Sequence, residues 1–296
     1  MHLIDGGTLT SVSGIKVGHW SDSDAMTGCT VIDLPEPNIV SGETRGAAPG
    51  SRETALLEPG MSVEQAQAFV LAGGSAFGLA CVDGVMHALE TDGRGFPTPW
   101  GSVPIVPAAA LFDLGVGSAS VRPTAEHGAI AYRAATDAPV EQGMVGAATG
   151  ATISKWRGAP GPGGIGSAAV RVGNATVGAL IAVNALGDAF SLEGESLTGG
   201  PHVPGSLATA PPVGQNTSLV VVATDAALSR SELGRLSVRA HDALGACLRP
   251  AHTSFDGDTC FVVSTGTASA PIHDVAEAAF AAVGRSIEYA VTNTAC

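Results

Sequence analysis

Short runs of β-branched and other apolar residues alternate along this chain with alanine-rich segments of helical periodicity. Runs of this length, with turn residues at most of their ends, are typical of buried strands. The strands and helices mix without a strict βαβ rhythm, which predicts a layered α+β sandwich. The predicted strands cover residues 30–34, 168–172, 176–183, 219–224 and 260–264.

Several segments of the chain predict helices. Residues 62–65 (SVEQ) have the spacing of a capping box, and they predict a helix that ends at the Gly73-Gly74 pair. A second helix is expected over 76–89. Near the C-terminus, 231–248 and 274–289 have the periodicity of amphipathic helices. The apolar face of the first of these consists of Leu233, Leu236, Ala240, Leu244 and Cys247.

The chain is poor in charge and acidic for its size. Charged residues make up 14% of the sequence, against roughly 25% in a typical globular protein. This indicates a homo-oligomer whose protomer faces are buried against one another. The net charge of −13 argues against nucleic acid and anionic membranes as partners. With 296 residues, 45% of them hydrophobic, we expect a single domain.

Cysteine and histidine usage argues against disulfides and metal sites. The five cysteines are odd in number and form no C-x-x-C pair, and none of the eight histidines has a metal-ligand spacing. The N-terminus lacks a signal-peptide pattern, and the longest apolar runs are too short to span a bilayer. We therefore expect a cytoplasmic protein with reduced thiols.

The segment 188–216 interrupts the pattern of strands and helices. It is rich in Gly, Pro, Ser and Thr and has no usable periodicity. A structureless connection of more than about 12–15 residues is unusual inside a compact domain. The segment leads directly into a β-branched strand, with Thr217 at the joint. Composition alone also fits an ordinary surface loop.

A threonine at this joint could act as a nucleophile. Its hydroxyl is weak unless a base lies beside it, and a free α-amine on the same residue, with an unperturbed pKa of about 7.7–8.0, can be that base. Releasing the amine requires cleavage of the Asn216–Thr217 bond. A flexible loop ahead of a rigid strand would let the released end move away. The motif alone also fits an ordinary strand N-terminus.

Several sequence blocks occur in order along nearly the whole chain. They are GIKVGH at 14–19, RGAAPGSRET at 45–54, LAGGSAFGL at 71–79, VPIVP at 103–107, the run 176–188, the Asn216-Thr217 junction and DGDT at 256–259. Together they resemble the L-aminopeptidase/D-esterase–D-amidase family, which includes β-aminopeptidases and nylon-oligomer endohydrolases. The resemblance implies a four-layer αββα sandwich, related to the ornithine acetyltransferase fold, that is self-cleaved into chains 1–216 and 217–296.

The resemblance also implies roles for individual residues. Thr217 matches the family's cleavage-site nucleophile, which is serine in β-aminopeptidases and threonine in nylon-oligomer hydrolases. Asn184 matches an asparagine assigned to the oxyanion hole, and a side-chain amide is a suitable donor to a tetrahedral intermediate. Without the resemblance, Asn184 could instead satisfy backbone groups at a strand end.

Further positions follow the nylon-oligomer branch of that family. Lys155 matches a lysine whose ammonium, near Thr217, would stabilise negative charge and keep the α-amine neutral. Asp256 and Asp258 match two positions that orient the nucleophile, which are serine and glutamate in β-aminopeptidases. A solvated loop lysine and a tight turn capped by its own aspartates are the alternatives. Phe112 stands where family members can have a tyrosine near the oxyanion, so a relative's substrate preference does not transfer.

The sequence therefore predicts a self-processing amide hydrolase that forms an acyl-enzyme on Thr217. Its substrates would be small peptides or amide oligomers, without a cofactor or metal, and the resemblance implies a tetramer of αβ units. Two alternatives remain. An acyltransferase resembling ornithine acetyltransferase would pass the acyl group to an amine, and a non-catalytic binding protein would keep the fold without cleavage.

Overall fold

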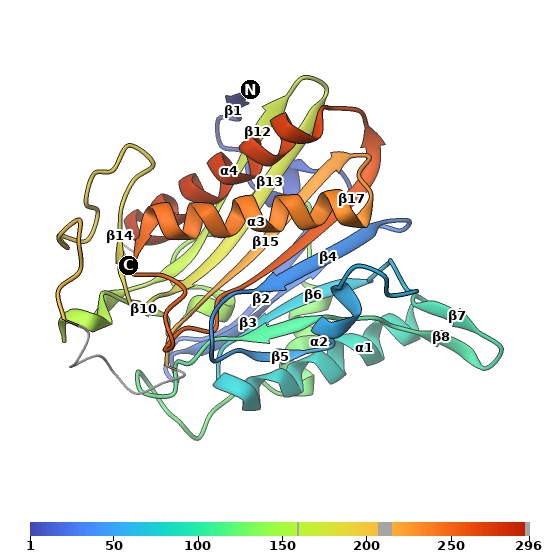
Figure 1. Cartoon of the computed structure of the whole chain (residues 1–296). Coiled ribbons are helices and arrows are strands. Elements are labelled where there is room, and N and C mark those ends of the chain that lie inside the picture. Colours follow the sequence, from blue (N-terminus) through green and yellow to red (C-terminus); the bar gives the residue numbers. More distant parts are fainter. Residues whose placement is uncertain (159, 207–214, 294–296) are drawn as a thin grey trace.

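The computed structural model describes residues 1–158, 160–206 and 215–293. Within these residues two large β-sheets stack face to face, and helices cover the outer face of each (Figure 1). The layers therefore follow the order helix, sheet, sheet, helix. This arrangement confirms the predicted α+β sandwich with αββα layers.

The larger sheet contains the strand that begins at Thr217. β13 (Ala175–Asn184) and β15 (Thr217–Ala226) are antiparallel, β15 and β17 (Thr259–Ala268) are parallel, and β17 and β4 (Ile39–Thr44) are antiparallel. Strand β15 is therefore hydrogen-bonded on both sides. In the described residues the spatial order is β1 (His2–Leu3), β12 (Gly164–Val172), β13 (Ala175–Asn184), β15 (Thr217–Ala226), β17 (Thr259–Ala268) and β4 (Ile39–Thr44).

The second sheet is formed by the N-terminal part of the chain. Its order in the described residues is β2 (Lys16–Asp22), β3 (Thr27–Asp33), β6 (Ala68–Ala72), β9 (Ala108–Ala110) and β5 (Gly50–Arg52). Shorter pairs lie outside the two sheets. They are β7 (Phe96–Thr98) with β8 (Gly101–Val103), β10 (Thr152–Ile153) with β11 (Gly161–Pro162), and β14 (Asp188–Ala189) with β16 (Leu248–Arg249).

Side chains along β15 alternate between two hydrophobic cores. Val220 and Val222 pack toward the helices, whereas Leu219, Val221 and Ala223 pack between the two sheets. A strand buried on both faces gives a continuous apolar run, as 219–224 does. The five strands predicted from such runs are all confirmed; each begins before its predicted start, and β13, β15 and β17 also end after their predicted ends.

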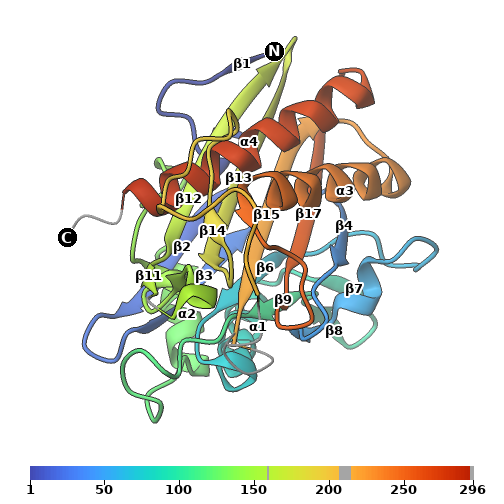
Figure 2. The same cartoon turned by 60° about the vertical axis from the view of Figure 1, so that its left-hand side comes forward.

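Two helices cover the larger sheet, and Figure 2 shows them side by side across it. Helix α3 (Arg230–Cys247) begins with a capping box in which Ser229 accepts from the Glu232 amide. All five residues of its predicted apolar face are buried. Helix α4 (Ile272–Thr292) confirms the other C-terminal prediction. Its buried stripe of small residues allows close packing on β12 and β13.

The outer face of the second sheet is covered by α1 (Cys81–Thr91) and α2 (Ala125–Arg133) (Figure 1). The segment predicted as a helix over 76–89 starts as the 3₁₀ helix η3 (Ser75–Ala80) and continues as α1. Gly84 lies where the two helices cross, since a Cβ there would meet the Ala125 carbonyl oxygen at 1.7 Å.

The helix predicted over residues 62–73 is wrong. Residues 68–72 form β6, which is antiparallel to β3 and parallel to β9. Every residue of β6 is buried, with Phe69 and Leu71 between the sheets and Val70 toward the outer helices. A short apolar run that is buried on both faces has no polar face, so its periodicity does not separate strand from helix.

Part of the segment predicted to be structureless is tied to the rest of the protein. Within 188–206, the fully buried Asp188 carboxylate accepts hydrogen bonds from Arg157 Nη2 at 2.7 Å and Thr198 Oγ1 at 2.9 Å. The start of the segment therefore packs against the 3₁₀ helix η5 (Lys155–Arg157). Residues 207–214 of the predicted loop lie outside the described residues.

In the described part of the chain, no helix has both the length and the apolar composition needed to cross a bilayer. No group of three or more His, Cys, Asp or Glu side chains there is placed to hold a metal ion. Cys29, Cys81, Cys247 and Cys260 are buried free thiols.

Candidate active site

Thr217 is the first residue of β15, at one end of the space between the two sheets. It shares a strand face with Leu219 and Val221, whose side chains fill the inter-sheet core. Thr217 is 3% exposed, and Asn216 before it is fully buried. The predicted cleavage site therefore lies inside the fold, where the neighbouring strands fix its surroundings.

Strands on both sides of β15 supply the neighbours of Thr217. Asn184, the last residue of β13, pairs with Thr217 across the antiparallel ladder. On the other side, Asn216 forms a parallel bridge with Asp256, just before β17. Two strand ends and the turn before a third therefore meet at the Asn216–Thr217 bond.

Two donors point at the carbonyl oxygen of the Asn216–Thr217 peptide bond. The Thr217 hydroxyl donates to the Asn216 oxygen, and the Gly257 amide donates to the same oxygen at 2.9 Å. A Cβ at Gly257 would lie 2.8 Å from Thr217 Oγ1 and 2.8 Å from the Ala48 oxygen, so this turn requires glycine. The arrangement places a nucleophilic oxygen beside the preceding carbonyl and a backbone donor on its oxygen.

Lys155 lies in η5 and reaches the residues beside Thr217. Its Nζ donates to the Asn184 main-chain oxygen at 2.9 Å, to Asn184 Oδ1 at 2.8 Å and to the Gln215 oxygen at 3.1 Å. Burial lowers the pKa of Lys155 to about 7, and the carboxylates of Asp256 and Asp258 oppose that shift. The structure therefore places Lys155 beside Asn184, the partner of Thr217.

The fully buried Asn184 amide has a partner for each of its groups. Its Nδ2 donates to the Phe112 oxygen at 3.1 Å and to the Gln215 oxygen at 3.4 Å, while Oδ1 accepts from the Thr152 amide at 2.9 Å and from Lys155. In the continuous chain, Asn184 therefore donates beside the Asn216 oxygen rather than to it. Position 112 contributes a backbone oxygen to this site.

Asp256 and Asp258 flank Gly257 and hold its turn in place. Asp256 Oδ2 accepts from the Thr253 amide at 2.8 Å and from the Thr253 hydroxyl at 2.5 Å. Burial, together with the neighbouring Asp258, raises the pKa of Asp256 to about 6. Asp258 Oδ1 accepts from the amide of Ser218, the residue after Thr217, at 2.7 Å. Asp256 thus fixes the start of the turn that carries the Gly257 amide, and Asp258 fixes the backbone directly after Thr217.

Several groups at the site were not identified from the sequence. The Gly257 amide and the Gln215 carbonyl are backbone groups, which leave no mark on residue type. His252 Nδ1 lies 2.8 Å from Asp258 Oδ2, and this contact raises the pKa of His252 although burial lowers it. A lone histidine in a loop gives no sequence signal. The glycine between the two aspartates is the one sequence feature that indicates close contact between this turn and neighbouring backbone.

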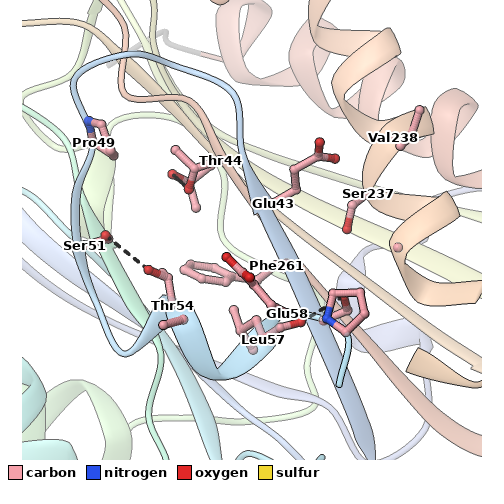
Figure 3. A pocket seen from close by; sticks show the side chains of 16 residues that line it. Glu43, Thr44, Pro49, Ser51, Thr54, Leu57, Glu58, Ser237, Val238 and Phe261 are labelled. Atoms are coloured by element: carbon pink, nitrogen blue, oxygen red, sulfur yellow. Dashed lines mark hydrogen bonds between the residues drawn. The ribbon is translucent and has the colours of Figure 1, made fainter. Parts of the chain in front are cut away.

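A cavity of about 590 Å³ opens beside the site, between β4, α3 and the 3₁₀ helix η2 (Thr54–Leu57) (Figure 3). Figure 3 shows Phe261 and Leu57 at its apolar part and Glu43 and Glu58 among the polar side chains. Thr217 does not line the cavity. Pro49 borders both places, because its Cα lies 3.2 Å from the position that a Gly257 Cβ would take.

Comparison with known proteins places the chain among amide-cleaving enzymes. The model of peptidase family S58 matches residues 7–296. An uncharacterised aminopeptidase of Mycobacterium leprae is 40% identical, and the match covers 89% of this chain and 80% of the relative. A 6-aminohexanoate-oligomer endohydrolase of a Kocuria species is 28% identical over 87% of this chain and 75% of the relative.

A solved structure has the same fold. The L-aminopeptidase D-Ala-esterase/amidase of Ochrobactrum anthropi, described as a variant of the Ntn hydrolase fold, superposes with a TM-score of 0.71 at 20% identity. The superposition covers 96% of this chain and 85% of that one. The chain therefore belongs to peptidase family S58 and is a hydrolase that acts on amide bonds.

Proposed function

We propose that the chain cleaves its own Asn216–Thr217 bond and then hydrolyses linear amide bonds through an acyl-enzyme on Thr217. The observation that carries this proposal is the pair of donors on one oxygen. The Thr217 hydroxyl and the Gly257 amide both donate to the Asn216 carbonyl oxygen. This places the attacking oxygen beside the bond that self-cleavage would break, with a backbone donor on the oxygen where negative charge would develop.

Self-cleavage begins with attack of Thr217 Oγ1 on the Asn216 carbonyl carbon. Negative charge develops on the carbonyl oxygen, where the Gly257 amide stabilises it as an oxyanion donor. The carbon–nitrogen bond then breaks, the hydroxyl proton passes to the departing nitrogen, and an ester joins Asn216 to Thr217 Oγ1. Water hydrolyses this ester. The products are a carboxylate on Asn216 and a free α-amine on Thr217.

Turnover repeats this chemistry on an external amide. The new α-amine takes the Thr217 hydroxyl proton as general base and returns it to the leaving amine. The substrate carbonyl oxygen would take the position of the Asn216 oxygen, against the Gly257 amide. Lys155 Nζ lies beside the main-chain oxygen of Gln215, the residue before Asn216, and its positive charge disfavours protonation of the Thr217 amine. The oxyanion role expected for Asn184 stays a prediction for this second reaction.

The substrates that we propose are small peptides or amide oligomers. The Mycobacterium leprae relative is named an aminopeptidase and the Kocuria relative an endohydrolase of 6-aminohexanoate oligomers. Both names describe linear amides, which supports that class for this chain. The buried free thiols fit a reducing compartment, and we propose a cytoplasmic tetramer of αβ units.

A denaturing gel of Thr217→Ala protein tests the proposal. The wild-type chain should give two fragments, the smaller of 296 − 216 = 80 residues, or about 8 kDa by proportion of 29.3 kDa. Thr217→Ala removes the nucleophile and should give one uncut band, whereas Thr217→Ser keeps a hydroxyl and should still be cut. Cleavage of Thr217→Ala at the same bond would show that another protease is responsible.

A further inference from the structure

The carbonyl oxygen of Gln215 accepts hydrogen bonds from two side chains of the site. Lys155 Nζ donates to it at 3.1 Å and Asn184 Nδ2 at 3.4 Å. Gln215 precedes the cleavage site by one residue, on the side that self-cleavage releases. The same two side chains remain in the body of the protein when that end departs.

A count of donors shows what the departure of Gln215 would leave behind. A lysine ammonium has three N–H groups, and the three acceptors around Lys155 Nζ are the two oxygens of Asn184 and the oxygen of Gln215. The amide of Asn184 has two, which go to Phe112 and Gln215. Loss of Gln215 therefore frees one N–H on each side chain, and both are directed at the same point.

Donors left without acceptors in a buried place are unfavourable, so either water or a substrate oxygen takes that position in the mature protein, and a substrate that displaces the water with an oxygen of its own keeps both hydrogen bonds. The carbonyl carbon that Thr217 attacks in turnover should take the position that the Asn216 carbonyl carbon has in self-cleavage. The acyl part of a substrate then extends into the volume that Asn216 and Gln215 occupy in the continuous chain. The vacated oxygen position belongs to a carbonyl that is reached from the scissile carbon through the C–Cα, Cα–N and N–C bonds.

We propose that the mature chain prefers amides whose acyl residue carries an acylated α-nitrogen, with the added carbonyl bound by Lys155 and Asn184, in place of the oxyanion role expected for Asn184. This substrate class rests on the proposed function and makes the enzyme endo-acting. A substrate with a free amino terminus would place an ammonium beside Lys155 Nζ and offer no acceptor to either donor. Below the pKa of Lys155, about 7, both groups are positive and also repel each other.

Three p-nitroanilides with the same leaving group test this preference in the mature wild-type protein. N-acetylalanyl p-nitroanilide has the added carbonyl, propanoyl p-nitroanilide has neither carbonyl nor amine, and alanyl p-nitroanilide has the free amine. We expect kcat/KM to fall in that order. The first should exceed the second by roughly ten- to hundredfold, the value of a hydrogen bond to a charged donor.

The wild-type ranking decides the question without any variant. A higher kcat/KM for alanyl p-nitroanilide than for its acetyl derivative would overturn the inference and leave the proposed hydrolase in place. If the self-cleaved protein hydrolyses none of the three, the proposed function itself fails.

Lys155→Met adds a second readout in protein that has matured. Because Lys155 is also proposed to keep the Thr217 amine neutral, Lys155→Met should lower kcat/KM for all three substrates near neutral pH. The readout is therefore the ratio of the acetyl to the propanoyl kcat/KM, measured at pH values above the ascending limb of each profile. This ratio should fall toward one through a rise in KM for the acetyl substrate, and a ratio that stays at its wild-type value would contradict the proposal.

Discussion

Replacing Gly257 with alanine would place a methyl group between the Thr217 hydroxyl and the Ala48 backbone. The new Cβ would lie 2.8 Å from Thr217 Oγ1 and 2.8 Å from the Ala48 oxygen, whereas ordinary contacts begin near 3.4 Å. Relief on both sides requires a shift of 3.4 − 2.8, or about 0.6 Å. If Gly257 moves by that amount, its bond to the Asn216 oxygen lengthens from 2.9 Å to about 3.5 Å, which is too long for an effective donor.

The loss of one oxyanion donor lowers rates by roughly 10²–10³-fold, and we expect Gly257→Ala to slow self-cleavage by that factor. Freshly translated, radiolabelled chain separated on denaturing gels over time gives the first-order rate. Gly115→Ala is the matched control, because a Cβ at Gly115 has no heavy atom within 4 Å. A folded Gly257→Ala protein that cuts within threefold of wild type would refute the donor role of this amide.

The remaining predictions concern pH and assembly. Asp256 has its pKa raised from 3.8 to about 6 in the folded chain, so its contribution to stability is present at low pH and lost as pH rises through 6. Asp256→Asn should therefore raise the free energy of unfolding at pH 8, by up to roughly 3 kcal/mol, and the gain should vanish near pH 4 in denaturant titrations. The kcat/KM of wild-type protein should rise with pH through one apparent pKa between roughly 6.5 and 9. Asp258→Asn should move that limb to lower pH and Lys155→Met to higher pH, and unmoved profiles would exclude the Thr217 α-amine as the base. Sedimentation equilibrium should give a closed oligomer, and a mass near 29 kDa at micromolar concentration would contradict it; Trp100, 92% exposed on the β7–β8 hairpin, is the first residue to test as a contact.

The strand and helix patterns predicted most of the fold where each element has one distinct signal. Helix α3 has a capping box and a polar face, so both its start and its buried side could be read from the sequence. Residues 68–72 have neither, because strand β6 is covered on both faces by other elements. β6 is a strand because it pairs with β3 and β9, which lie far from it in the sequence. The periodicity of residues 68–72 alone carries no information about those partners.

The candidate site was predictable to the extent that it consists of side chains. The joint between the loop and the strand points to Thr217, and the resemblance adds Asn184, Lys155 and the two aspartates of the turn at 256–258; the structure brings these side chains together. Their contacts were not predictable, because the groups they bind are mostly backbone atoms. The amide of Gly257 is the main example. Its role depends on a parallel bridge between residues forty positions apart.

The position of β15 and β17 in the larger sheet changes how the mature protein would unfold. Both strands follow the cleavage site, yet they lie between β13 and β4, which precede it. The proposed cleavage would therefore leave two interleaved polypeptides, and each would lack strands that its hydrogen-bond ladders require. Unfolding of the continuous chain is a unimolecular reaction, whereas unfolding of the cleaved protein releases two species. The midpoint of unfolding of the cleaved protein should rise with protein concentration, and its refolding after dilution should become second order, so the proposed cut would make recovery of the fold depend on protein concentration.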